Sequence, residues 1–166
     1  MKRSSILAIL LTMFVFGSST NLSAHCQIPC GIYGDNMRFE MWMEHITTIE
    51  KSMNQIIKLS KAETPNYNQI VRWVNNKDSH ADNIMDIALN YFLAQRIKPL
   101  ADQNDMAAKE IYAAQLETVH HIIVHAMKAK QTTDIQHVEA LQSLMKKLYK
   151  LYFNEDMEHH LSEHDH

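Results

Sequence analysis

Apolar side chains recur every three or four residues from residue 36 onward, the spacing that places them on one face of an α-helix. The first such pattern predicts a helix over residues 36–62, ended by the Thr, Pro and Asn of residues 64–66. Gly34 forms a turn before it, and we expect Asp35 or Asn36 to cap the helix by accepting first-turn N–H groups. The apolar face comprises Phe39, Trp42, Met43, Ile46, Ile49, Met53, Ile56, Ile57 and Ser60.

The second pattern predicts a helix over residues 68–97, closed by Lys98 and Pro99. The polar residues 75–79 interrupt the pattern, so we expect a kink or a break there. The inner side of this helix is expected to hold Ile70, Val71, Val74, His80, Ile84, Ile87, Ala88, Tyr91 and Phe92.

Two further helices are predicted in the second half of the chain. One begins near residue 102 and reaches residue 130, and the next starts at Thr133, which has the spacing of a capping box with Gln136. The third helix carries Met106, Ile111, Ala114, Leu116, His121, Val124 and Met127, and the fourth is expected to bury Ile135, Val138, Leu141, Leu144, Met145, Leu148 and Leu151.

Four amphipathic helices with short connections pack most simply as an all-α, up-down four-helix bundle, here over residues 35–154. The 166 residues suffice for one domain with a sizeable core, and three Gly and three Pro leave few helix breakers. The formal net charge is −3. This balance gives no support to nucleic-acid binding, which needs a basic surface.

Residues 1–24 have the features of a cleaved secretory signal peptide. Lys2 and Arg3 form a basic start, residues 6–16 are apolar, and the small residue Ala24 closes the segment. A retained membrane anchor is the weaker alternative, because a span needs roughly 18 to 20 apolar residues. We therefore expect an exported protein, periplasmic or secreted, that begins at His25 and has no membrane attachment after processing.

Both cysteines of the chain, Cys26 and Cys30, directly follow this predicted cut. Two cysteines in an exported protein ordinarily form a disulfide, which is one interpretation. The other is a metal site, in which a terminal His25 offers its amine and imidazole, Cys26 a thiolate and its amide nitrogen, and Cys30 a second thiolate. Mixed nitrogen and sulfur donors of this kind suit a late first-row metal.

The string HCQIPCGIY of residues 25–33 resembles the nickel hook of nickel superoxide dismutases, whose pattern is H-C-x-x-P-C-G-x-Y at the mature N-terminus. The matching residues are His25, Cys26, Pro29, Cys30, Gly31 and Tyr33. The resemblance implies a hook over residues 25–34 that binds one nickel ion per subunit through His25, Cys26 and Cys30. It implies conversion of superoxide to oxygen and hydrogen peroxide by Ni(III)/Ni(II) cycling. It also implies a homohexamer in which a neighbour covers each hook.

The same resemblance assigns three catalytic candidates. Tyr33 corresponds to a family tyrosine that orders substrate and water at the entrance of the site, and Tyr91, which precedes Phe92, corresponds to a second. Glu40 corresponds to a glutamate that orients the axial imidazole. Judged from the residues alone, Tyr91 could also be a core aromatic with a satisfied hydroxyl, and Glu40 part of a solvated helix face.

The arginine that supports this glutamate in the family has no clear counterpart. Arg72 comes early in the second helix, and Asn76 and Lys77 stand nearest the expected place. Lysine has a single ammonium group in place of the planar guanidinium of arginine. If Lys77 takes the place of that arginine, it would support the metal site through a different hydrogen-bond geometry. Gln27 replaces the acidic residue that is usual after the first cysteine.

Histidines outside the hook are weaker metal candidates. The acidic tail, residues 155–166, holds four of the eleven histidines and is either a solvated terminus or a loose binder of nickel, copper or zinc. His121 and His125, four apart on the third helix, could bridge a metal. A pair without a third ligand is more often surface or satisfied core.

Two other functions stay open at this point. One is an exported nickel-binding or metal-binding helical protein without redox turnover, and the other is a disulfide-closed bundle that acts as an interaction module. Free thiols with bound nickel would exclude the module. Catalysed loss of superoxide would exclude the passive binder.

Overall fold

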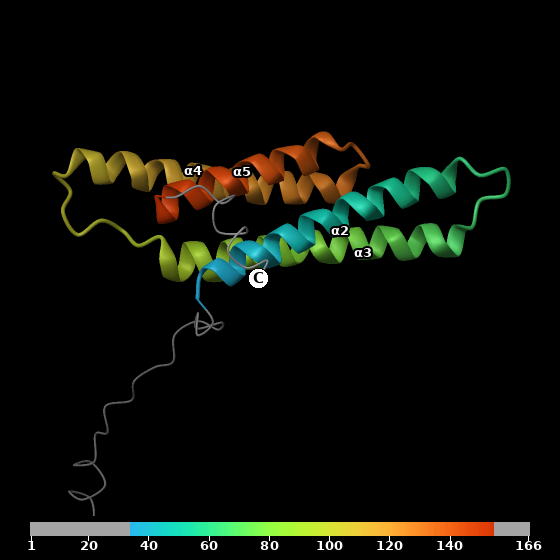
Figure 1. Cartoon of the computed structure of the whole chain (residues 1–166), viewed down its shortest axis with the longest axis horizontal. Coiled ribbons are helices and arrows are strands. Elements are labelled where there is room, and N and C mark those ends of the chain that lie inside the picture. The colour runs from blue at the N-terminus through green and yellow to red at the C-terminus, as the bar shows by residue number, and fades with distance from the viewer. Residues whose placement is uncertain (1–33, 155–166) are drawn as a thin grey trace, which may run out of the picture.

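The computed structural model describes residues 34–154, which are helices and the connections between them (Figure 1). The predicted signal peptide, the tail and all of the hook except Gly34 lie outside these residues. The helical segments are α2 (Asn36–Ser60), α3 (Tyr67–Asp86), the π-helix η1 (Ile87–Arg96), α4 (Met106–Gln131) and α5 (Gln136–Phe153).

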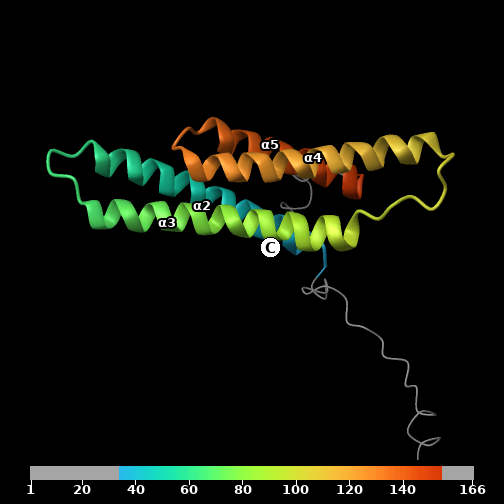
Figure 2. The same ribbon diagram turned by 180° about the vertical axis from the view of Figure 1, so that it is seen from behind.

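The helices form two antiparallel hairpins, α2 with α3 and α4 with α5, that lie against each other (Figures 1 and 2). The π-helix continues α3. Helix α2 packs against α3 and α5, and α4 packs against the same two helices, so consecutive helices are neighbours around the bundle. Within residues 34–154 this confirms the predicted all-α, up-down arrangement. None of the helices in this range has the length and apolar character needed to cross a membrane.

The bundle core is aromatic at the end where α2 begins. Phe39 makes edge contacts with Trp42, Phe92 and Tyr149, with ring centroids 5.0 to 5.6 Å apart. Trp42 also stacks on Phe92 at 4.7 Å and donates a hydrogen bond of 3.1 Å from Nε1 to the carbonyl oxygen of Ile84. This bond satisfies the indole N–H inside the core.

The expected kink at residues 75–79 is wrong, because α3 runs through them without interruption. Their polar groups bond to neighbouring helices instead. Lys77 is almost fully buried, and its Nζ donates to the carbonyl oxygens of Ala129 and Lys130 at 2.6 Å each. These carbonyls belong to the last turn of α4, where a cation is favourable. Lys77 thereby ties α3 to the end of α4.

The predicted starts of the last two helices also need correction. Helix α4 begins at Met106, four residues later than expected, because Asp105 caps it by accepting from the N–H of Ala108 at 3.0 Å. Helix α5 begins at Gln136, so Thr133 does not form a capping box. Asp134 accepts from the backbone N–H of Gln136 at 3.0 Å instead.

The apolar face of α4 differs from the predicted one. Three of the residues expected on it, Met106, Ile111 and Met127, are 65, 50 and 42% exposed. The buried residues of α4 are Thr118, Val119, Ile122, Ala126 and Ala129. Small and β-branched residues thus form the fully buried face of α4, and Met106, Ile111 and Met127 lie on its outer side.

Candidate functional site

The described chain begins at Gly34, the last residue of the predicted hook. Gly34 has φ +84°, a left-handed conformation that favours glycine, although a Cβ built there would meet no atom within 4 Å. Glycine is therefore favoured here by the left-handed backbone conformation. A side chain would find enough room at this position. The next residue, Asp35, occupies the position before the first turn of α2.

Asp35 does not cap α2 with its side chain, contrary to the sequence prediction. Its carboxylate accepts three side-chain hydrogen bonds: Oδ1 from the Tyr91 hydroxyl and from Arg96 Nε at 2.8 Å, and Oδ2 from the Tyr152 hydroxyl at 2.6 Å. Arg96 Nη2 also donates to the Tyr91 hydroxyl at 2.9 Å. These four residues are called the Asp35 cluster below. Charge-assisted bonds of this kind are stronger than a single neutral capping bond.

The Asp35 cluster joins three elements at one end of the bundle. Figure 1 shows the start of α2, the end of η1 and the end of α5 close together there. Asp35 contributes from the first of these, Tyr91 and Arg96 from the second and Tyr152 from the third. The residue at the root of the predicted hook is therefore fixed to both halves of the bundle.

The π-helix explains why Tyr91 and Arg96 can act together. In an α-helix of 3.6 residues per turn, residues five apart point about 140° away from each other. In a π-helix the hydrogen bonds join residues five apart, as between the N–H of Ile97 and the carbonyl of Phe92 at 2.8 Å, so such residues share a face. Segments of this kind often occur at functional sites, and this one covers ten residues.

The cluster keeps Asp35 ionised and its tyrosines protonated near neutral pH. Burial raises the pKa of the Asp35 carboxyl, but the hydrogen bonds from Tyr152, Tyr91 and Arg96 outweigh it and lower the pKa below its ordinary value. Burial and the bond to Asp35 raise the pKa of both Tyr91 and Tyr152. The bond to Asp35 also raises the pKa of Arg96. Both phenol protons therefore remain in place.

A second cation lies beside the same tyrosine. The guanidinium carbons of Arg38 and Arg96 are 5.0 and 4.6 Å from the centroid of the Tyr91 ring, within cation–π range. Arg96 is paired with Asp35, whereas Arg38 forms no ion pair with any residue between 34 and 154. The charge of Arg38 is therefore available to an anion near Tyr91.

Among the residues predicted for the site, only Tyr91 lies in the Asp35 cluster. The predicted metal ligands His25, Cys26 and Cys30, and also Tyr33, lie outside the described residues. Glu40 is exposed on α2 and makes no hydrogen bond or ion pair within the described part of the chain.

The residues considered for the missing arginine lie elsewhere in the subunit. Lys77 is engaged with the end of α4 and stands 14 residues before Tyr91, about 21 Å along a helix. Arg72 and Asn76 line a separate hollow with Gln69 and Trp73. The sequence prediction missed Arg96, because an α-helical register places it on the face opposite Tyr91.

His121 and His125 do not come together. His121 Nε2 lies 3.8 Å from a carboxylate oxygen of Glu117, and His125 pairs across the hairpin with His137. Between residues 34 and 154 no three His, Cys, Asp or Glu side chains are grouped so that they could hold a metal. The predicted hook ligands lie outside these residues, and their imidazole, amine and thiolate donors remain the candidates from the sequence, since such donors suit a late first-row metal.

Comparison with known proteins supplies the family. No curated protein and no solved structure matches the chain. A family model described as nickel-containing superoxide dismutase matches residues 20–156, which is most of the chain. The all-helical fold agrees with the bundle that the hook resemblance implies. The chain therefore belongs to the family of nickel-containing superoxide dismutases, and its cofactor is nickel.

Proposed function

We propose that this protein converts two superoxide ions and two protons into oxygen and hydrogen peroxide at a nickel ion held by His25, Cys26 and Cys30. The observation that carries the proposal is the attachment of Asp35 to Tyr91, the buried tyrosine that the hook resemblance singles out. Asp35 is only two residues after Tyr33. Two residues of chain reach about 7 Å at most, so the contact with Asp35 puts Tyr91 close to the point where the predicted hook joins the bundle.

The donors of the hook suit one-electron chemistry. When bound, nickel supplies the electron exchange with superoxide, and one ion per subunit is expected. The thiolates of Cys26 and Cys30 and the amide nitrogen of Cys26 are anionic donors that make the higher oxidation state accessible. The amine and the imidazole of His25 would supply the remaining nitrogen donors to the nickel ion. The amine is available only if the chain begins at His25, which is why the proposal includes export and cleavage after Ala24.

The hydrogen bonds of Tyr91 define what it can do for the substrate. Its O–H proton is directed to Asp35, and its oxygen accepts from Arg96 Nη2 at 2.9 Å. One lone pair of the oxygen remains, so Tyr91 can accept a hydrogen bond from a water or from hydrogen peroxide. Because Tyr91 is fully buried, its hydroxyl can hold only an enclosed water or peroxide at this position, and the proposal takes the protons of the reaction from solvent.

Arg38 provides attraction for an anionic substrate. Superoxide carries one negative charge, and an unpaired guanidinium near the site raises its local concentration. Because Arg96 is neutralised by Asp35, Arg38 supplies most of this attraction among the described residues around Tyr91.

A homohexamer in which a second subunit covers each hook fits the surface near the Asp35 cluster. Met37, in the first turn of α2, is 40% exposed, and Leu89 of η1 is 47% exposed. These two side chains are candidates for contacts with that second subunit. Glu40, exposed on α2, is free to orient the His25 imidazole within this assembly.

Serine variants of the two cysteines test the proposal. Cys26→Ser and Cys30→Ser should each abolish superoxide loss, because an alcohol is a far weaker nickel donor than a thiolate. Truncation after Asn154 is the matched control and should retain activity, since it removes only the histidine-rich tail. A fully active Cys30→Ser protein would overturn the mechanism and favour a metal-binding protein without redox turnover.

A further inference from the structure

The bundle contains two pairs of histidines. In each pair, one histidine comes from each helix of a hairpin and the two rings face each other. His45 of α2 and His80 of α3 have their Nδ1 atoms 2.9 Å apart. His125 of α4 and His137 of α5 have theirs 3.2 Å apart. All four side chains are partly exposed, so each pair is open to solvent on one side. Neither pair belongs to the Asp35 cluster or to the hook.

The distance between the ring nitrogens matches that of two ligands on one metal ion. Imidazole nitrogens bind Zn²⁺ at about 2.0 to 2.1 Å, so two of them lie about 2.9 Å apart at a right angle and about 3.4 Å apart in a tetrahedron. The same distance allows a hydrogen bond between one N–H and one bare nitrogen. A cation can bind both Nδ1 atoms when the ring that donated from Nδ1 carries its proton on Nε2 instead, so both rings stay neutral and the helices need not move.

We propose that His45 and His80 form an accessory site for a divalent late first-row cation, nickel or zinc, separate from the hook and beyond the proposed dismutase function. The site would use the two Nδ1 atoms as its protein ligands, with water completing the coordination shell. Imidazole suits both metals. No third His, Cys, Asp or Glu ligand is in place among residues 34–154. We therefore expect modest affinity and no redox chemistry, because thiolate donors are missing.

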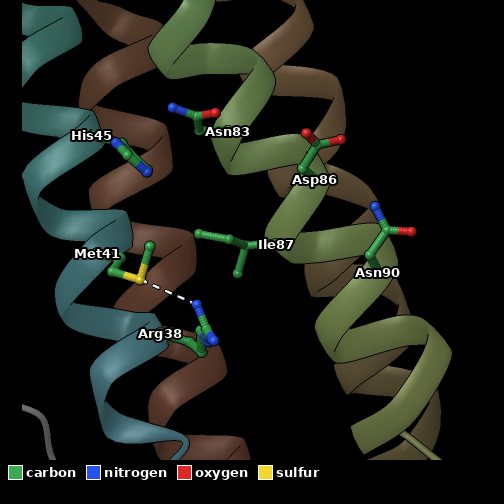
Figure 3. Close-up of a pocket in the computed structure, with 7 residues that line it drawn as sticks. All are labelled: Arg38, Met41, His45, Asn83, Asp86, Ile87 and Asn90. Carbon is green, nitrogen blue, oxygen red and sulfur yellow. Dashed lines mark hydrogen bonds between the residues drawn. The ribbon is translucent and has the colours of Figure 1, made fainter. Parts of the chain in front are cut away.

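The charges around the two pairs favour His45 and His80. Glu44 lies close enough to His45 to favour a positive charge on it. His45 also lines a hollow of about 390 Å³ between α2 and α3, together with Asn83 and Asp86 (Figure 3). These oxygen-bearing side chains can bond to metal-bound water. Arg38 lines the same hollow at its other end and is the one cation among its lining residues.

The surroundings of the second pair oppose a cation. Lys128 and His121 both act on His125 in the sense that disfavours positive charge, in addition to burial and His137. A divalent ion between His125 and His137 would meet the same repulsion. Two pairs of similar geometry therefore differ in the charges around them, and this difference provides a matched control.

The position of the first pair supports the assignment, because His45 lies on α2 and His80 on α3. Because the two ligands come from different helices, a bound ion would stabilise the folded chain relative to the unfolded one.

The test uses the full chain with Cys26→Ser and Cys30→Ser, so that the thiolate ligands of the hook are absent and His25 is common to all variants, and compares variants in zinc and in nickel chloride. We expect both salts to raise the thermal midpoint of this parent. His80→Ala should lose that increase and bind at least about tenfold more weakly, whereas His137→Ala should keep it. Any binding by the tail is common to all variants. An equal increase with His80→Ala, or its loss only with His137→Ala, would overturn the proposal.

A second measurement does not depend on the variants folding. Adding zinc to the parent at neutral pH should shift the ring-proton NMR signals of His45 and His80 more than those of His125 and His137. Unchanged signals for His45 and His80 would contradict the site. Neither experiment measures superoxide loss, so this inference can fail while the dismutase proposal stands, and the reverse also holds.

Discussion

Arg96 donates a hydrogen bond to the hydroxyl of Tyr91, five residues earlier in the same π-helix, at 2.9 Å. Both residues also donate to the carboxylate of Asp35, which begins the ordered bundle directly after the hook. A local change of helix type in the middle of the chain thus provides the two partners that fix its N-terminal end. The relationship connects the fold to the proposed metal site and leads to the following predictions.

Replacing Asp35 by Asn should destabilise the protein near neutral pH by about 1 to 3 kcal/mol, the cost of leaving buried donors poorly paired. Because folding lowers the pKa of Asp35, its contribution is present above the ordinary value of 3.8 and disappears as the pH falls through the lowered folded value. Urea unfolding of both proteins at pH 7 and below pH 3 should show the difference narrowing in acid. An equal difference at both pH values would contradict the role of the carboxylate charge.

Tyr91→Phe and Tyr152→Phe remove similar hydrogen bonds to Asp35 but should differ in activity. Only the Tyr91 hydroxyl both donates to Asp35 and accepts from Arg96, and Tyr91 is the residue assigned to ordering water. We expect kcat/KM for superoxide to fall about tenfold in Tyr91→Phe, the factor that corresponds to losing one hydrogen bond of about 1.4 kcal/mol. Tyr152→Phe should reduce stability and leave turnover within about twofold. Equal losses of activity would mean that both tyrosines act only through the fold.

Arg38→Gln should lower kcat/KM for superoxide and reduce its dependence on ionic strength. The reason is that an exposed charge acts on an incoming anion through a field that salt screens over about 10 Å at 0.1 M. Arg72→Gln removes the same charge from a surface distant along α3 and is the control. The assay is the rate of superoxide decay from 10 mM to 300 mM salt. If salt lowered the rate of superoxide decay equally for Arg38→Gln and for the parent, electrostatic attraction of superoxide by Arg38 would be excluded.

Arg96→Lys should destabilise the protein although the charge is kept. Arg96 uses Nε for Asp35 and Nη2 for Tyr91, and a single ammonium cannot reproduce this two-pronged geometry. We expect a loss of about 1 kcal/mol, comparable to one hydrogen bond, in the free energy of unfolding. Arg72→Lys, in the same measurement, should be neutral. A fully stable Arg96→Lys protein would show that charge alone holds Asp35.

The helical fold could be predicted from the sequence because apolar spacing reports directly on helices. The first helix illustrates this: its predicted start at residue 36 is the observed one, and Phe39, Trp42, Ile46 and Ile49 are buried as expected. The spacing of apolar residues did not predict which partners the side chains of Lys77 and Asp35 contact. Both positions were interpreted by local rules, a polar interruption and a helix cap, whereas partners more than 50 residues away determine them.

The π-helix was not predictable in the same way. The stretch Ile87–Arg96 has no glycine or proline to mark a change of helix type, so the sequence predicts a continuous α-helix there. In that register Tyr91 and Phe92 still face the core, but Arg96 does not join them. The tyrosine could therefore be identified from the sequence and its arginine could not. The metal ligands were assigned from the hook string alone and remain a prediction, because they lie outside the described residues.

The most direct test of the central claim is one sample of the protein, purified from the compartment in which it occurs in its own cells. N-terminal sequencing, metal analysis and a superoxide assay would be carried out on that sample. The proposal predicts a chain that begins at His25, contains one nickel ion per subunit and removes superoxide catalytically. A chain that retains residues before His25, or that carries a Cys26–Cys30 disulfide without nickel, would contradict the catalytic hook.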